Sequence, residues 1–594
     1  MEKRAHLLRF IIGLMLVAAP AWTGIVANDD VDRYAYPDLV IPQESPSSLE
    51  QIKEVFEQNS QYFHDVEIIN NTHYPGMKTL FFRFLQHLDP SEGEEDVCFY
   101  QRAVITNYTG PDAVTVMNTN GYDLDVSEDF HVDDIALELN ANYLAVEHRY
   151  HGESLPPASS YAPEGPLTSE NYWSKCRAVY ASHDLCTLVN TLKKLRIFTG
   201  KWLSTGTSKN GMTTTFLAMH YPNTCDAYLP FCAPFCKSME DPIMDVIHYK
   251  YSGFLEEEDK LTGQNSAEVW QRSCDLLTDI LSNPQLLQRM MDIQRDLWER
   301  PSMPDAEACF RVVLSYMDSQ WTRAIYLHVS DWARYLPARV APDQEITDDL
   351  LRDIYTFIYI SYYEIIEERN KQARALVRNF INLQDTQDAD SRHRAPGEPP
   401  TKSILSADPY DVQCMIELGH YAFSLPSQIK EAVEKAGYSY DELIRRWNTF
   451  NFKPYTTLRQ YYPFTPIEPE VKEFVKTTHC QILFVYGQYD PWTSAGIQDS
   501  DIPASQTNVQ RILVPAGVHS NRVSSGAYYS PLDPSIGQTI IEKTRNMLGL
   551  PTGINGLASA PSPHGGQIYN LAGQRVGTGY RGLVIRNGRK VYQR

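Results

Sequence analysis

A serine between glycines occupies the centre of the segment LSTGTSKNGMTTTF, residues 203–216. A β-prone run precedes Ser208 and a helix-like run follows it, as on the tight strand-to-helix turn that presents a nucleophile. A serine hydroxyl is a poor nucleophile until an imidazole removes its proton and a third group fixes that imidazole. The rest of the chain must therefore supply an acid and a histidine.

Two polar residues meet that need, each after a β-prone run. Asp490 follows ILFVYGQY, and His519 ends RILVPAGVH. The order serine, acid, histidine, with each group at the C-terminal end of a strand, is the order found in α/β-hydrolases. We predict that Ser208 is the nucleophile, His519 the proton shuttle and Asp490 the carboxylate that orients it. The competing histidines do not stand one strand after the acid: His148, His151 and His420.

The oxyanion of a tetrahedral intermediate requires hydrogen-bond donors. The backbone N–H of Lys209, at the start of the expected helix, is the first candidate. The loop after VTVMNTNGY should supply the second, so we nominate Gly121 and Tyr122. The simplest expectation for the Lys209 side chain is that it is solvated. Asn210 stands where G-x-S-x-G has its second glycine, and asparagine tolerates unusual backbone angles well enough for the turn to form.

The segment EHRYHG places His148 and His151 three residues apart. At a strand end, with no acidic cluster alongside, this spacing does not indicate a metal site. We expect these residues to brace the loop beside the active site through charged hydrogen bonds. The predicted chemistry needs no cofactor.

Strand-like and helix-like segments alternate through the first part of the chain, which favours a mostly parallel sheet with helices on both faces. From about residue 237 to 456 the pattern is helical, and core-like strands then return. The sequence predicts an α/β fold with a hydrolase core in two parts, 28–236 and 457–550. A helical cap, 237–456, is inserted between them, and a linker with a small β-rich tail, 551–594, follows.

The N-terminus has the order of a signal peptide: the basic MEKRAHLLR, the apolar FIIGLMLVAA and small-residue cleavage sites. We expect residues 1–27 to be removed on export to the periplasm, the cell surface or the medium, with no stable membrane span afterwards. The formal net charge of −21 disfavours nucleic acid as a partner. Ten cysteines in an exported chain permit disulfides of undetermined pairing, and the single CAPFC pair, Cys232 and Cys236, gives little support for a zinc site.

Several segments together resemble the exported serine peptidases related to streptomycete-type tripeptidyl aminopeptidases. That family is the sister of the lysosomal Pro-X carboxypeptidase and dipeptidyl peptidase II group. The matching segments, within residues 78–548, are NTNGY, AVEHRYHGES, SHDLCTLV, GTSKNGM, YGQYDPW and GVHSNRV. The family's Gly-Gly-Ser-Lys-Gly-Gly motif is kept here except at Thr207 and Asn210. The C-terminal tail resembles the sorting tails on secreted proteins of some Gram-negative bacteria.

The resemblance implies a capped α/β-hydrolase that acts on peptide substrates and releases short peptides from free N-termini, often with proline near the scissile bond. An acidic group that holds the substrate ammonium would explain such selectivity. CMIELGHY resembles a family motif near that cleft, which makes Glu417 a candidate, with Glu147 of EHRY behind it. A loop-bracing or surface carboxylate is the alternative for both. Weaker candidates are Glu364, Glu367 and Glu368.

Two other functions stay open. A lipase or esterase could use the same triad, and a non-catalytic binding protein could retain the scaffold, as the departures at Thr207 and Asn210 would allow. The sequence does not set the oligomeric state, the length of the released peptides or the preferred residues at the cleavage site.

Overall fold

A computed structural model describes residues 29–91, 97–124, 127–128, 130–156, 171–243, 266–298, 344–359, 407–422, 427–447, 453–488, 490–515, 517–519, 534–551, 568–570, 575–576, 582–586 and 589–593. The expected signal peptide, residues 1–27, lies outside these ranges, as do the weaker candidates Glu364, Glu367 and Glu368.

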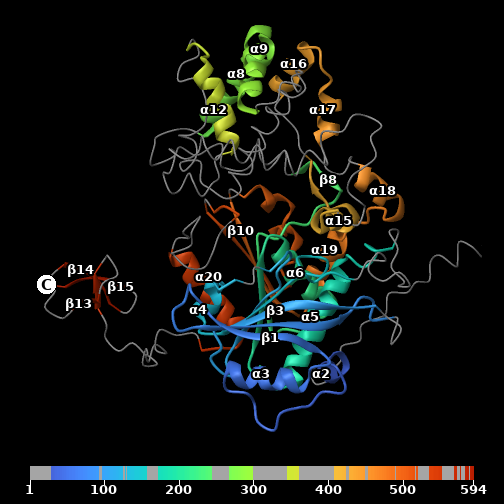
Figure 1. Ribbon diagram of the computed structural model, residues 1–594, viewed down its shortest axis with the longest axis vertical. Helices are drawn as coiled ribbons and strands as arrows, with labels where there is room; N and C mark the ends of the chain where they lie inside the picture. The colour runs from blue at the N-terminus through green and yellow to red at the C-terminus, as the bar shows by residue number, and fades with distance from the viewer. Residues whose placement is uncertain are drawn as a thin grey trace, which may run out of the picture. The chain divides into compact units, whose positions relative to one another are not determined.

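A nine-stranded sheet with the order β1-β2-β3-β5-β4-β6-β7-β10-β11 carries the fold. Figure 1 shows its strands between helical layers. The strands are β1 (Phe63–Asn70), β2 (Lys78–His87), β3 (Cys98–Thr106), β4 (Thr115–Asn118), β5 (Asn142–Val146), β6 (Trp202–Thr207), β7 (Ala227–Phe231), β10 (Gln481–Gly487) and β11 (Val509–Val514).

The direction and burial of the strands divide the sheet in two. The strands β1, β2, β3 and β5 pair antiparallel, whereas β5, β4, β6, β7, β10 and β11 run parallel. Every residue of β5 and β7 is buried, as expected for parallel strands that are covered on both faces. The alternating burial of β2 marks a strand with one face less covered. This antiparallel start followed by a parallel sheet is the α/β-hydrolase fold, as predicted.

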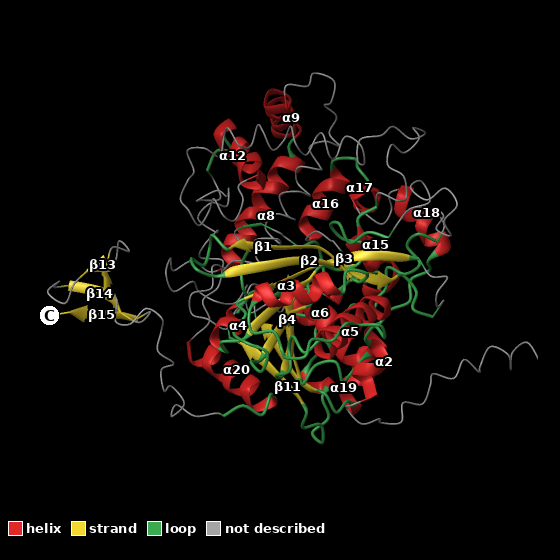
Figure 2. Ribbon diagram, turned by 60° about the horizontal axis from the view of Figure 1, so that its bottom comes forward, coloured by secondary structure: helices red, strands yellow, loops and turns green. Residues whose placement is uncertain are grey.

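Helices cover both faces of the sheet (Figure 2). On one side, contacts join α2 (Asp29–Tyr34), α5 (Ala178–Lys194), α6 (Lys209–His220) and α19 (Glu468–Thr477) into a layer. On the other side lie α4 (Asp134–Glu138), which contacts β4, and α20 (Pro534–Met547), which contacts β7 and β10. The amphipathic α3 (Leu49–Gln58) packs against β1 and β2. The parallel strands β6, β7 and β10 are thereby enclosed from both sides.

The chain between β7 and β10 is mostly helical where described. Besides α19, its described elements are β8 (Glu240–Asp241), α8 (Ser266–Ser282), α9 (Pro284–Trp298), α12 (Asp348–Tyr359), α15 (Pro409–Gln413), the π-helical turn η4 (Cys414–Leu418), β9 (His420–Tyr421), α16 (Ser427–Lys435), α17 (Tyr440–Trp447) and α18 (Lys453–Tyr461). Residues of α15 and η4, among them Val412 and Met415, join the buried core of the hydrolase. This part of the predicted cap segment therefore belongs to the core by its packing. The boundaries of the cap stay a prediction.

Met1–Leu548 and Gly549–Arg594 form two compact units. The second contains a four-stranded sheet of β12 (Ile568–Asn570), β13 (Arg575–Val576), β14 (Gly582–Arg586) and β15 (Arg589–Gln593). Across the described ranges, no helix combines the length and apolar character that crossing a bilayer requires. No disulfide joins any two of the nine cysteines in those ranges, and all of these cysteines except Cys98 are buried.

Candidate active site

Ser208 occupies a strained turn between β6 and α6. Its φ of +61° and ψ of −126° lie in a region that residues other than glycine rarely adopt. Its N–H donates to the Phe231 carbonyl at 2.9 Å. A Cβ on Gly206 would lie 2.5 Å from Asn210 Cβ, and one on Gly211 would lie 2.7 Å from the Phe231 oxygen. Both glycines are therefore needed for the close approach of strand and helix.

Asn210 is helical rather than left-handed, so the sequence argument about its tolerance of unusual angles does not apply. The positive φ falls on Ser208 instead. The Asn210 side chain has another task, since its Oδ1 accepts the Gly121 N–H at 2.6 Å. The residue that stands where the motif usually has a glycine thus links α6 to the loop after β4.

Asp490 and His519 form a buried hydrogen-bonded pair. Asp490 follows β10, His519 follows β11, and these two strands are parallel neighbours. His519 Nδ1 lies 2.7 Å from Asp490 Oδ2, and the two residues are 3% and 1% exposed. Asp490 Oδ1 accepts the Trp492 N–H at 3.0 Å, which fixes the carboxylate. Because β6, β10 and β11 are parallel strands of one sheet, Ser208, Asp490 and His519 all follow strand ends at the same edge.

One of the predicted oxyanion donors already forms a hydrogen bond within the protein. The Gly121 N–H is already donated to Asn210, so its single proton is committed. The carbonyl of the same residue accepts from Lys209 Nζ. In a planar trans peptide the C=O and the following N–H point in opposite directions, so these bonds also fix the direction of the Tyr122 N–H. The assignment of the Tyr122 N–H, and of the Lys209 N–H at the first position of α6, to the oxyanion stays a prediction.

The Lys209 side chain is buried, contrary to the expectation that it is solvated. The residue is 2% exposed, and besides the Gly121 carbonyl its Nζ lies 2.9 Å from His151 Nε2. The rings of Tyr122 and Tyr410 stand 5.1 and 5.5 Å from Nζ. Burial lowers the pKa of Lys209 to about 8. No sequence feature indicated these contacts, because Tyr410 comes from a segment about 200 residues away in the chain.

The loop of EHRYHG is braced by hydrogen bonds and ion pairs, as expected. Arg149 forms a buried ion pair with Asp184 and also donates to the Leu88 carbonyl at 2.9 Å. His148 Nδ1 lies 2.8 Å from the Arg149 carbonyl oxygen. Burial lowers the pKa of His151 to about 2, and burial together with nearby positive charge also lowers the pKa of His148. Both rings are therefore held neutral.

The two candidate substrate-binding carboxylates already have protein partners. Glu147 pairs with Arg102 and accepts the Leu124 N–H at 2.8 Å and the Ser154 hydroxyl at 2.6 Å. These contacts hold the loop in place, which is the alternative role that the sequence analysis left open for Glu147.

Glu417, on η4, accepts the Ala178 N–H at 2.6 Å at the start of α5 and lies 3.8 Å from Arg177. Burial raises the pKa of Glu417 to about 7. This carboxylate caps α5, and its capture of a substrate ammonium stays a prediction.

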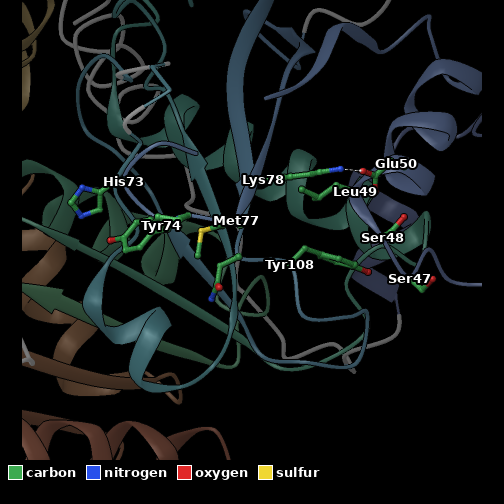
Figure 3. Close-up of a pocket in the computed structure, with 12 residues that line it drawn as sticks. Ser47, Ser48, Leu49, Glu50, His73, Tyr74, Met77, Lys78 and Tyr108 are labelled. Atoms are coloured by element: carbon green, nitrogen blue, oxygen red, sulfur yellow. Dashed lines mark hydrogen bonds and ion pairs between the residues drawn. The ribbon is translucent and has the colours of Figure 1, made fainter. Parts of the chain in front are cut away.

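A cavity of about 740 Å³ lies at the opposite edge of the sheet. It is lined by the start of α3, the turn before β2 and Tyr108, as Figure 3 shows. Lys78 Nζ lies 2.5 Å from Glu50 there. The register runs from Thr79 through Thr106 to Tyr143, at the beginning of β5, so this cavity adjoins the amino ends of the parallel strands. It is separate from the candidate active site, which is at the carboxyl ends.

The sheet order and the serine turn define the class of the protein as an α/β-hydrolase. Residues 59–277 match the family described as PS-10 peptidase S37. A prolyl tri/tetrapeptidyl aminopeptidase of Streptomyces mobaraensis is 27% identical over 172 residues, 28% of this chain and 32% of the relative. The chain thus matches about a third of that curated relative's length. Both matches are to peptidases, and they confirm the resemblance to the streptomycete-type tripeptidyl aminopeptidase family.

Solved structures also align with the chain. A proline iminopeptidase from Mycobacterium smegmatis is 9% identical with a TM-score of 0.27, over 76% of this chain and 96% of its own. A bromoperoxidase from Bacillus anthracis is 9% identical with a TM-score of 0.28, over 79% and 99%. At these scores the alignments add no argument, and the fold assignment rests on the sheet topology.

Proposed function

We propose that this protein is an exported serine exopeptidase that releases short peptides, chiefly tripeptides with a preference for proline, from free N-termini. The observation that carries the proposal is the buried 2.7 Å hydrogen bond between Asp490 and His519, at the sheet edge where Ser208 occupies its strained turn. The peptidase family matched by residues 59–277 supports peptides as the substrate class.

The reaction proceeds through an acyl-enzyme. Ser208 Oγ attacks the scissile carbonyl carbon while its proton passes to His519 Nε2, and Asp490 stabilises the resulting imidazolium through Nδ1. The N–H groups of Lys209 and Tyr122 stabilise the oxyanion. His519 then protonates the leaving amine, and a water molecule, deprotonated by the same imidazole, releases the peptide acid.

Hydrolysis of matched peptides tests the substrate class. Purified protein is given proline-containing tetrapeptide amides with a free or an acetylated N-terminus, and chromatography identifies the released fragment. The proposal predicts rapid release of a tripeptide from the free peptide and at least tenfold slower cleavage of the acetylated one. Equal cleavage of both would remove the exopeptidase assignment. Hydrolysis of acyl esters alone would favour the lipase or esterase alternative.

A further inference from the structure

Cys232 lies beside the acid–base pair and has no role in the chemistry above. Its sulfur, a carboxylate oxygen of Asp490 and a ring nitrogen of His519 all lie within 4.8 Å of one another. Cys232 is 0% exposed, and its two neighbours are nearly as deeply buried. Three different metal-binding groups thus converge at one place.

The position of the sulfur is set by the sheet. Cys232 directly follows β7, and its N–H donates to the Val485 carbonyl of β10 at 2.8 Å. Its φ of +47° is uncommon for a residue with a side chain and persists only where the surroundings impose it. Cys232 follows β7 and Asp490 follows β10, and these two strands are paired neighbours in the sheet. The fold therefore holds the thiol and the carboxylate close together.

We propose that Cys232, Asp490 and His519 form a site for a soft divalent cation, with zinc as the best-suited ion, and that the bound ion switches off the enzyme. Thiolate, imidazole and carboxylate are all ligands that zinc binds in tetrahedral sites. With zinc–sulfur bonds of about 2.3 Å and zinc–nitrogen bonds of about 2.0 Å, these ligand atoms stand about 3.5 Å apart. Movements on the order of 1 Å within the 4.8 Å cluster reach that geometry.

Binding replaces one set of bonds by another without any redox change. The Cys232 thiol releases its proton to solvent, and its sulfur, one Asp490 oxygen and one His519 nitrogen bind the cation, with water as the fourth ligand. The imidazole keeps one proton, on the nitrogen that does not face the ion. The Asp490–His519 hydrogen bond is lost, so the histidine can no longer serve Ser208. Because a thiol proton is released, affinity rises with pH.

Metal binding is tested separately from catalysis. The predicted loss of activity rests on the proposed function, whereas the metal site itself does not depend on it. Full-length protein, stripped with a chelator, is titrated with cobalt(II) and followed by absorption spectroscopy, where a cobalt–thiolate bond gives a charge-transfer band. The same samples are titrated with zinc(II) in the peptide assay, each scaled to its own rate without metal. The variants are Cys232→Ser and, as a matched buried thiol four residues away, Cys236→Ser.

The expected result is one cobalt ion per chain with a thiolate band in the wild type and in Cys236→Ser, and no band in Cys232→Ser. Zinc should inhibit the first two reversibly and Cys232→Ser at least tenfold more weakly. A wild-type cobalt spectrum without a thiolate band overturns the proposal, even if Cys232→Ser fails to fold. Equal zinc inhibition of all three proteins overturns it as well. A thiolate band in a protein that cleaves no peptide supports the metal site and rejects the proposed function.

Discussion

Ser208, Lys209 and Asn210 are consecutive in the chain, yet each has a different structural role. Ser208 stands on the strained turn, Lys209 Nζ holds the Gly121 carbonyl, and Asn210 Oδ1 holds the Gly121 N–H. The two residues after Ser208 therefore form hydrogen bonds to both the N–H and the carbonyl of Gly121. The orientation of the loop after β4, which is predicted to supply an oxyanion donor, depends on them.

Asn210→Ala should lower kcat on the order of tenfold, since the loss of one hydrogen bond to the loop costs about 1.4 kcal/mol of transition-state stabilisation. KM should change less than threefold, because the substrate contacts stay in place. Steady-state kinetics measures both constants, and a melting curve checks the fold. A rise in KM at constant kcat would show that Asn210 acts in substrate binding instead.

Lys209 should give the activity an alkaline limit. With a pKa near 8, its ammonium loses the proton as pH rises above 8, and with it the charge that holds the Gly121 carbonyl. The value of kcat/KM should fall above pH 8 in the wild type, whereas Lys209→Met should be less active and flat over pH 7.5–9.5. Lys201→Met, at an exposed lysine before β6, is the control and should keep the wild-type profile. An unchanged alkaline limb in Lys209→Met would contradict this account.

At the scale of elements, the Glu417 carboxylate links η4 to the start of α5. Glu417 accepts the Ala178 N–H, one of the N–H groups that a helix start leaves without an internal partner. Because the folded pKa of about 7 lies above the ordinary value of 4.5, the folded chain holds a proton between these pH values that the unfolded chain has released. This contribution to stability is present below pH 4.5 and is lost as pH rises through 7.

Glu417→Gln should therefore melt progressively higher relative to the wild type as pH rises from 5 to 8, with a change of at most about 3 kcal/mol in the free energy of unfolding. Thermal melts at several pH values measure the difference, and Glu473→Gln, at an exposed position of α19, is the control. A melting difference that stays constant with pH would contradict this prediction. If Glu417 also holds the substrate ammonium, the loss of its charge should weaken substrate binding. KM for free peptides should then rise at least tenfold.

At the scale of the whole molecule, the alternation of strand-like and helix-like segments was enough to predict the α/β core. The chain order of serine, acid and histidine was enough to place three residues at one sheet edge. The placement succeeds because each group lies within five residues of the end of a β-prone run, which is a local feature of the sequence. The burial of Lys209, the Asn210–Gly121 bond and the position of Cys232 could not be predicted. Each of these features depends on contacts between segments that are distant in the chain. The Lys209 side chain, for example, contacts Tyr410, which lies within the predicted cap region.

The C-terminal unit gives a further prediction at this scale. Since Met1–Leu548 and Gly549–Arg594 are separate compact units, ending the chain after Leu548 should leave the main melting transition within about 1 °C and kcat/KM within about twofold. Calorimetry and the peptide assay on both forms measure this. A drop of several degrees would show that the tail stabilises the hydrolase unit.

The central claim is that Ser208 is an activated nucleophile, and covalent labelling tests it most directly. The purified protein and Ser208→Ala are incubated with a fluorophosphonate, and peptide mass mapping locates the adduct. The account predicts one adduct, on Ser208, with parallel loss of peptidase activity, and none in Ser208→Ala. An unlabelled Ser208 in folded wild-type protein would contradict it and would place the non-catalytic binding protein first.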